Sequence, residues 1–285
     1  MNSLTADRIR DAISGEIRSH LDILEVFSEI ESTNSYLLKQ RCPAPGRYRV
    51  ALAENQTAGR GRMDRSWYSP PFSGLCMSMA FTFRRMPENL PSLSLAIGTG
   101  IAQALERLGI RGIGLKWPND IIARDGKLGG VLSEVVAANA GGVTVVVGIG
   151  LNVDLENTDV NSRITSGVGG AADLASCSDE LPSRAAISAA LIERLYDTMV
   201  RFEVDGFSTF VEAWQQYDWL SGRKVTIETA DGRASGVAQG VDTDGALLLV
   251  ANGDRRRITS GSVTLSDQAG DQAGEQAAGQ AGEYP

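Results

Sequence analysis

The sequence comprises 285 residues, of which 42% are hydrophobic, enough to bury a core in one large domain or in a large and a small one. Its 27 basic and 35 acidic residues give a net charge of -8, which argues against a nucleic-acid binder held by a basic surface. The only histidine, His20, and three cysteines without metal-ligand spacing argue against a histidine-dependent nucleophile and a zinc site.

From the N-terminus, the expected elements are a helix at 5–17, a helix that starts after Ser32 or Thr33, a strand at 48–56, a strand at 75–83 and a helix at 92–108. The first helix is predicted because Ile9, Ile13 and Ile17 recur every four positions. In the strand at 75–83, bulky residues alternate with small ones, which predicts one bulky and one tight face.

The second half continues with strands at 112–123, 127–137 and 143–153, a loop at 154–182, a helix that starts after Ser183 and a short helix at 207–219. From Arg223 onward, short apolar runs broken by Asp-Gly and Asn-Gly turns predict a small barrel of four or five strands. No apolar run approaches the about 20 residues that cross a bilayer, and no export signal is evident, so we expect a soluble cytoplasmic protein.

These elements predict an α+β fold in which a mixed or antiparallel sheet is flanked by helices. We expect a large unit over 1–220, a small C-terminal β-barrel over 221–265 and a disordered tail over 266–285. The tail repeats a QAG-like unit without large apolar residues, so it cannot build a core.

The glycine-rich loop GRGRMDRSW is the first candidate for chemistry. Gly59 and Gly61 let backbone N–H groups approach a ligand, while Arg60, Arg62 and Arg65 carry forked donors that match phosphate or carboxylate groups. The pattern predicts a loop that binds an anion. The alternative is an exposed loop whose charged side chains are only solvated. No GxxxxGK[ST] occurs in the chain, so the loop is not the nucleotide-binding P-loop.

Three further motifs place polar residues or glycines within or at the ends of predicted strands. In KWPND, Lys116 and Asp120 bracket a turn as a cation and a candidate magnesium ligand, and Trp117 offers a flat apolar wall. A surface turn with an ion pair would share this pattern. Lys127 precedes two glycines, and GIGLN interrupts a buried strand before Asn152; either a ligand or close packing explains these glycines.

The motifs ESTN, ENQTAGRGRMDRSWYSP, KWPNDI, KLGGVLSE and GIGLNV, in this order over most of residues 30–153, resemble those of the biotin protein ligases. The strands at 223–265 are similar to the last module of that family. The resemblance implies a class II synthetase-like catalytic domain followed by an SH3-like barrel. Regulatory members carry an N-terminal winged-helix DNA-binding domain. The stretch before Ser32 is short and acidic, so we expect the monofunctional class, without DNA or membrane partners.

The resemblance implies an ATP-dependent biotin ligase. The carboxylate of biotin attacks the α-phosphorus of ATP to give biotinyl-5′-AMP and pyrophosphate, and a lysine of a biotin carboxyl carrier domain of an acyl-CoA carboxylase then takes the biotinyl group. A carboxylic acid with a pKa of about 4 is ionised at neutral pH, so the first step needs no general base. Its difficulty is repulsion between two anions, which cations offset.

The same resemblance implies roles for individual residues. Lys127, Arg62 and Asp120 are implied as catalytic, with Asp120 also a candidate Mg²⁺ ligand and a hypothetical base in the transfer step. The implied biotin site comprises Ser32, Thr33, Asn34, Gln56, Gly59, Arg60, Gly61, Arg62, Lys127 and Gly129. The implied nucleotide site comprises Arg60, Arg62, Arg65, Trp67, Lys116, Asn119, Asp120 and Asn152, with ATP and Mg²⁺ as cofactors.

Two alternatives stay open. A lipoate or octanoate protein ligase would share the sheet and the adenylate chemistry, but nothing in this chain resembles the usual glycine-rich, histidine-containing motif of that group. A non-catalytic biotin-sensing regulator would bind biotin without exchanging pyrophosphate into ATP.

Overall fold

A seven-stranded sheet organises the larger part of the chain. The structure, a computed structural model, describes residues 4–139, 142–156 and 169–266. The strand order is β1-β2-β3-β7-β6-β5-β4, in which β1 and β2 pair in parallel and every other pair is antiparallel. The predicted α+β class with a mixed sheet is therefore confirmed.

The strands of this sheet are β1 (Leu21–Phe27), β2 (Tyr48–Ala53), β3 (Gly74–Phe83), β4 (Ile113–Lys116), β5 (Asp120–Ala123), β6 (Gly126–Asn139) and β7 (Gly142–Asn152). The helices are α1 (Ala6–Ala12), α2 (Gly15–Arg18), α3 (Thr33–Leu38), α4 (Leu93–Arg107), α5 (Arg184–Asp205) and α6 (Val211–Tyr217). Short 3-10 turns lie at Leu90–Ser92, Ala175–Cys177 and Ser208–Phe210.

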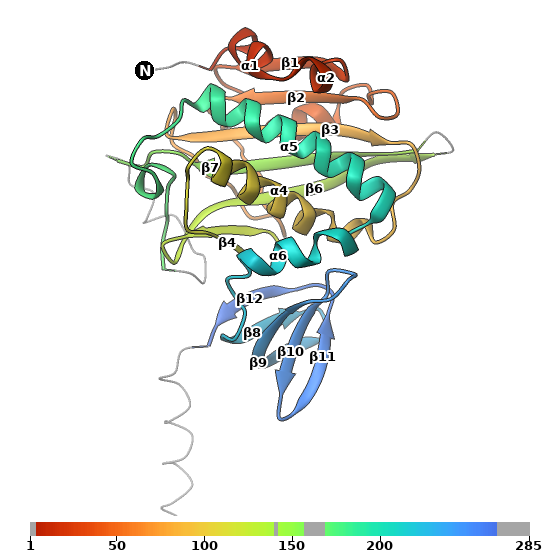
Figure 1. Cartoon of the computed structure of the whole chain (residues 1–285), viewed down its shortest axis with the longest axis vertical. Helices are drawn as coiled ribbons and strands as arrows, with labels where there is room; N and C mark the ends of the chain where they lie inside the picture. The colour runs from red at the N-terminus through yellow and green to blue at the C-terminus, as the bar shows by residue number, and fades with distance from the viewer. Residues whose placement is uncertain (1–3, 140–141, 157–168, 267–285) are drawn as a thin grey trace, which may run out of the picture.

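One face of the sheet is covered by α4 and α5, which cross it in Figure 1. The bulky alternate residues of β3, from Leu75 to Phe83, pack with both helices in the main hydrophobic core. The small alternate residues of β3 face the other side, where Ala80 packs with Leu37 of α3. The predicted bulky and tight faces of this strand are thus confirmed, and the tight face leaves room for a ligand.

Two local expectations were wrong, and one strand was not predicted. The single helix expected at 5–17 is two short helices, because Ile13 takes an extended conformation (φ -82°, ψ 134°) that buries its side chain. The strand expected at 112–123 is the β4–β5 hairpin, whose turn contains a cis peptide bond before Pro118. Strand β1 was not predicted; it lies at the sheet edge and buries only Leu24.

The C-terminal residues form a second, five-stranded antiparallel sheet, consistent with the expected small SH3-like unit. Its strands are β8 (Lys224–Thr229), β9 (Gly232–Val241), β10 (Leu247–Ala251), β11 (Asp254–Ile258) and β12 (Ser262–Leu265), in the order β11-β10-β9-β8-β12. Figure 1 shows this sheet below α6 and the edge of the large sheet. The tail expected to be disordered lies, apart from Ser266, outside the described residues.

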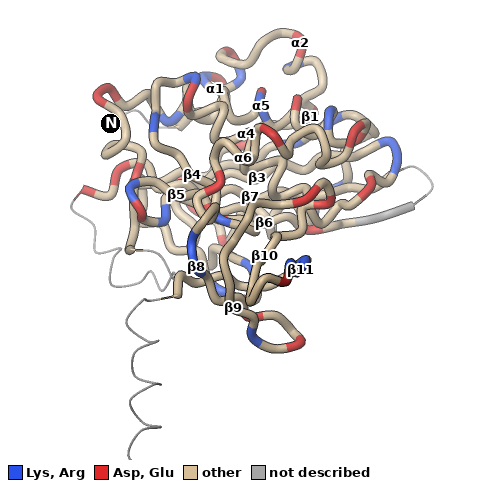
Figure 2. The backbone as a smooth tube through the Cα atoms, turned by 60° about the horizontal axis from the view of Figure 1, so that its bottom comes forward, with Lys and Arg blue, Asp and Glu red and all other residues tan. Residues whose placement is uncertain are grey.

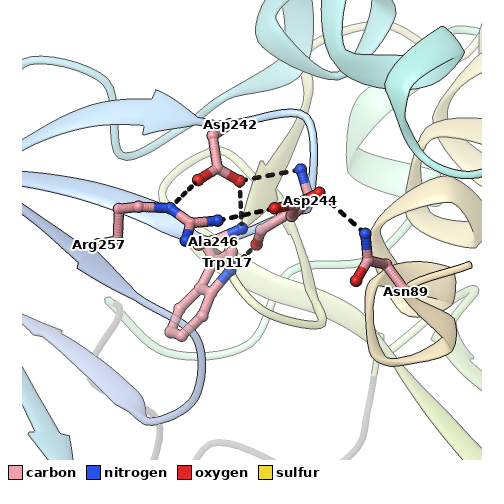
Figure 3. A network of polar contacts seen from close by, with 7 residues as sticks. Asn89, Trp117, Asp242, Asp244, Ala246 and Arg257 are labelled. Carbon is pink, nitrogen blue, oxygen red and sulfur yellow. Dashed lines mark hydrogen bonds and ion pairs between the residues drawn. The ribbon is translucent and has the colours of Figure 1, made fainter.

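The two sheets meet at the turn of the β4–β5 hairpin. The Nε1 of Trp117, a residue that is 2% exposed, donates to the carbonyl of Gly245 at 3.0 Å. The loop around Gly245 is itself tied to β11 through ion pairs of Arg257 with Asp242 and Asp244 (Figure 3). Trp117, the flat apolar residue of the KWPND motif, thus anchors the hairpin to the C-terminal sheet.

No helix in the described ranges is long and apolar enough to cross a lipid bilayer. The three cysteines are free thiols, and Cys76 is buried in β3.

Asp218 lies where α6 leads into the C-terminal sheet, and it carries an unfavourable buried charge. Its Oδ1 accepts the Leu220 N–H at 2.9 Å, whereas its buried Oδ2 has no hydrogen-bond partner. Burial raises the pKa of Asp218 from 3.8 to about 6, against a smaller opposing effect of the backbone N–H groups of Leu220 and Ser221. Because the folded pKa exceeds the unfolded one, ionisation of Asp218 destabilises the fold increasingly from about pH 3.8 to about pH 6, and the full effect is present above pH 6.

We therefore expect Asp218→Asn to stabilise the protein at pH 7.5 and to have little effect at pH 4. The gain is at most about 3 kcal/mol, because one pKa unit corresponds to about 1.4 kcal/mol. Urea unfolding of both proteins at several pH values measures it. A difference in unfolding free energy that stays constant between pH 4 and 7.5 would contradict the prediction.

Candidate active site

A cavity of ≈ 830 Å³ opens on the sheet face opposite α4 and α5. It lies over β3, β7 and β6, between the N-terminus of α3 and the glycine-rich loop. The predicted site residues that line it are Ser32, Thr33, Asn34, Gln56, Gly59, Arg60, Gly61, Arg62, Arg65, Trp67, Asn119, Asp120 and Lys127. The fold thus gathers residues from four separated segments of the chain around one space.

Glycines of β7 form the floor of this cavity. A Cβ atom on Gly148 would lie 2.3 Å from Oδ1 of Asn34, and one on Gly150 would lie 2.3 Å from Cε2 of Trp67. Successive same-face residues on a strand are about 7 Å apart, so Asn34 and Trp67 stand over neighbouring positions along the strand. The glycines therefore make room for two site residues, so close packing, one of the two explanations left open by the sequence, applies here.

The end of the cavity around Asn34 is a network of neutral hydrogen-bonding groups. Oε1 of Gln56 accepts the backbone N–H of Thr33 at 2.8 Å, and Oγ1 of Thr33 lies 2.7 Å from Oγ of Ser78. The Ser78 hydroxyl donates to Oδ1 of Asn34 at 2.6 Å. Ser32 caps α3, since its Oγ accepts the Ser35 N–H at 3.3 Å.

The other end of the cavity carries charged groups. Nζ of Lys127 lies 2.7 Å from Oδ1 of Asp120, and Nζ of Lys116 lies 3.6 Å from Oδ2 of the same carboxylate. The register pairs Lys116 with Asp120, Asp120 with Gly130, and Gly130 with Gly150, so these residues form one row across four strands. Burial lowers the pKa of Lys116 from its usual 10.5, although the charge of Asp120 opposes this effect.

A β-bulge directs Lys127 into the cavity. Gly129 pairs with Ile121 while Lys127 pairs with Ile122, so Leu128 has no partner on β5. Side chains alternate between the faces of a strand, and without the bulge Lys127 would point toward α4. The bulge instead sends Leu128 into the core and lays the Lys127 side chain over Gly130.

The glycine-rich loop is held over the cavity by its own backbone and by its arginines. The Gly61 N–H donates to the Arg65 carbonyl at 2.6 Å, and the Trp67 N–H donates to the Gly59 carbonyl at 2.9 Å. Nη1 of Arg62 donates to Oδ1 of Asn119 at 2.9 Å. Burial lowers the pKa of Arg62, although the charge of Asp120 opposes this effect.

Arg60 points to a different partner. Its guanidinium makes a forked ion pair with Glu134 of β6, with Nη2–Oε1 at 2.8 Å and Nη1–Oε2 at 3.1 Å. Of the three loop arginines, Arg60 is thus already neutralised by a carboxylate, whereas the described contacts of Arg62 and Arg65 are with neutral oxygens. Figure 2 shows acidic and basic residues interspersed over the molecule, so the positive charge at the cavity is a local feature.

Three predicted site residues do not line the cavity. Lys116 is 5% exposed and lies behind Asp120. Gly129 faces β7, where a Cβ would lie 2.5 Å from the Gly150 carbonyl oxygen. Asn152 is buried, and its Nδ2 donates to the carbonyls of Lys127 at 3.2 Å and Ala172 at 2.9 Å, so it supports the backbone that carries Lys127.

Sequence reasoning missed Ser78 and Glu134 as members of the site. Ser78 lies on the tight face of β3, and that alternation was the available signal for a small polar residue at the cavity. Glu134 ends the KLGGVLSE motif, but its contact with Arg60 joins residues 74 positions apart. No local pattern reveals such a contact.

The described residues do not form a resident metal site. No group of three or more His, Cys, Asp or Glu side chains in the described ranges is placed to hold a metal ion. Both oxygens of Asp120 face lysine ammonium groups, which occupy the positions that a cation would take.

Comparisons with known proteins match both the large sheet and the C-terminal sheet to one family. Residues 26–153 match the model of the "Biotin/lipoate A/B protein ligase family", and residues 220–266 match that of the "Biotin protein ligase C terminal domain". The chain is 32% identical over 266 residues to the bifunctional ligase/repressor BirA of Salmonella typhimurium, covering 92% of this chain and 78% of BirA. The chain belongs to the biotin protein ligase family.

Other members give the same result. The biotin–[acetyl-CoA-carboxylase] ligase of Mycobacterium tuberculosis is 30% identical over 246 residues, which cover 84% of this chain and 88% of that ligase. A solved structure of the Aquifex aeolicus biotin protein ligase with biotin and ATP has a TM-score of 0.69 and 26% identity, covering 87% of this chain and 98% of its own. Both the large sheet and the C-terminal sheet are therefore family features.

The glycine floor can be tested directly. We expect Gly150→Ala to displace Trp67, because the added Cβ would meet the indole at 2.3 Å, and to destabilise the protein by about 1 to 3 kcal/mol. Thermal unfolding and tryptophan emission measure the two effects. Gly15→Ala is the control, since no atom lies within 4 Å of its added Cβ. A Gly150→Ala protein with unchanged unfolding and emission would contradict this account.

Proposed function

We infer that this protein is an ATP-dependent biotin ligase that forms biotinyl-5′-AMP and then transfers biotin to a lysine. The observation that carries the inference is a cavity with a neutral hydrogen-bonding end at Asn34 and a cationic end at Lys127. A ligand with a ureido ring at one end and a carboxylate at the other matches both ends. Family membership supports the same reaction.

At the neutral end, we propose that Ser32, Thr33, Asn34 and Gln56 bind the ureido ring. The ring presents a carbonyl acceptor and two N–H donors, which short hydroxyl and amide side chains can match. Gly59 and Gly61 keep the loop backbone close to the valeryl chain. A site that hydrogen-bonds such a ring discriminates strongly against analogues that lack its polar groups. This favours biotin over lipoate, whose ring carries no N–H.

At the cationic end, Lys127, Arg62 and Arg65 would surround the biotin carboxylate and the α-phosphate of ATP. Each favourable contact between opposite charges is worth about 4 kcal/mol at ~4 Å and an effective dielectric constant of about 20. Two such contacts offset the repulsion between the reacting anions. This step needs no general base, because the biotin carboxylate is already ionised at neutral pH. Trp67 would cover the mixed anhydride and exclude water that would hydrolyse it.

The nucleotide would lie toward Asn119 and Asp120, with Lys116 behind them. Mg²⁺ would enter as part of the ATP substrate, since it keeps several waters and is held mainly by substrate phosphates. Asn152 would act indirectly, because its amide holds the backbone of Lys127 in place.

For the second step, we propose that the acceptor is a lysine of the biotin carboxyl carrier domain of an acyl-CoA carboxylase. Its amine attacks the carbonyl carbon of biotinyl-5′-AMP, forms an amide bond and releases AMP. Deprotonating a lysine at pH 7 costs about 4 to 5 kcal/mol. Asp120 is our candidate for the group that takes this proton, since it is a carboxylate in the cavity lining beside Lys127.

Lys127→Met tests the first step. It removes the ammonium but keeps the aliphatic stem, and we expect biotin-dependent exchange of pyrophosphate into ATP to fall about 100- to 1,000-fold. Lys224→Met, which changes an exposed lysine of the C-terminal sheet, is the control. Exchange should occur with biotin and not with lipoate. Exchange with lipoate would favour the lipoate ligase, and wild-type protein that binds biotin without exchange would favour the sensor.

Asp120→Asn tests the second step. Starting from preformed biotinyl-5′-AMP, we expect transfer to a carrier domain to slow by at least about 100-fold if Asp120 accepts the proton. Single-turnover transfer followed by mass spectrometry measures the rate. Unchanged transfer together with slower adenylation would remove the base role and leave Asp120 as the residue that holds Lys127 in position.

A further inference from the structure

The carboxylate of Glu134 has no role in the chemistry described so far, yet it is central to the neutral end of the cavity. It lies on β6 opposite Val146 and its side chain is 22% exposed. Oε2 accepts from Nδ2 of Asn34 at 2.9 Å and from Nη1 of Arg60 at 3.1 Å, while Oε1 accepts from Nη2 of Arg60 at 2.8 Å. One carboxylate thus holds a proposed ligand-binding amide and the rim of the loop.

Glu134 determines which way the Asn34 amide points. An ionised carboxylate and a backbone carbonyl can only accept hydrogen bonds, so the amide nitrogen must face Glu134 and the Leu132 carbonyl, at 2.9 and 3.4 Å. The amide oxygen is then directed to Ser78, whose hydroxyl donates to it at 2.6 Å. Its second lone pair remains available to accept an N–H group from a ligand.

Glu134 also fixes the position of Arg60. Through the forked ion pair it attaches the loop to β6, while Arg62 attaches the same loop to Asn119 on the other side of the cavity. The pair neutralises the only loop arginine at the neutral end. A ligand carboxylate therefore finds net positive charge toward Arg62, Arg65 and Lys127. These three cations outnumber Asp64 and Asp120, the two carboxylate residues among the described residues that line the cavity.

We propose that Glu134 is a positioning and specificity residue of the adenylation reaction. It presents Oδ1 of Asn34 to an N–H of the ureido ring, and by neutralising Arg60 it makes the opposite orientation of an anionic ligand unfavourable. This proposal rests on the function inferred above. It predicts that loss of Glu134 weakens biotin binding and leaves ATP binding and the chemical step nearly unchanged.

The test compares Glu134→Ala and Glu134→Gln by biotin-dependent pyrophosphate exchange. We expect Glu134→Ala to raise KM for biotin 10- to 100-fold, with kcat and KM for ATP changed less than threefold. Glutamine keeps an oxygen that can accept from Asn34, so Glu134→Gln should restore KM to within about fivefold of wild type. Glu228→Ala, which breaks an exposed Glu–Arg pair in the C-terminal sheet, is the matched control and should have no effect.

Asn34→Ala and the double variant Asn34→Ala/Glu134→Ala show whether Glu134 acts through Asn34. If it does, adding Glu134→Ala to Asn34→Ala raises KM by less than threefold. The proposal would be overturned if the double variant raised KM by the product of the two single effects. An unchanged KM in Glu134→Ala, or a decrease in kcat alone, would also overturn it. If Glu134→Ala fails to fold, the same comparison of KM with kcat in Glu134→Gln decides, and a larger effect there on kcat than on KM contradicts it.

The wild-type protein separates this proposal from the inferred function. Wild-type exchange with biotin and an unchanged KM in Glu134→Ala would overturn only the role of Glu134. Absence of any biotin-dependent exchange in the wild type would overturn both.

Discussion

The two faces of the large sheet carry side chains of different size, and the arrangement of the molecule depends on that difference. In β3 and β7, bulky residues point to α4 and α5, while small ones point to the opposite side. Dense packing on the first face fixes the strands. On the second face the absence of side chains at Gly148 and Gly150 leaves space that Asn34 and Trp67 only partly fill. The site is therefore built where the sheet is not covered.

Charge is distributed within this space by strand geometry. A one-residue bulge before Gly129 turns Lys127 toward the cavity, and the strand register places Asp120 beside it. Lys116 is nearly buried behind both, so its ammonium depends on Asp120 for compensation. A chain with a net charge of -8 can thereby present a cationic surface to an anionic substrate.

The contact between the two sheets involves the β4–β5 hairpin, which carries Asp120. The indole N–H of Trp117 donates to Gly245, and that of Trp219 donates to Asp125 at the next turn. The turns that precede Asp120 and Lys127 are thus both attached to residues near or within the C-terminal sheet. This placement explains why a bulky tryptophan lies in a polar motif without lining the cavity.

The sequence by itself determined the fold class, most of the strands and helices, and the segments that supply the cavity. Periodicity and turn residues are local properties, and the motif order along the chain identified the family resemblance. Only the tertiary structure decided which members of those motifs face the ligand space. It placed Lys116, Gly129 and Asn152 outside the cavity lining, added Ser78 to that lining, and added Glu134 as a partner of Asn34. Strand register, a bulge and contacts between distant segments determine where a side chain points, and these are set by packing of the whole chain.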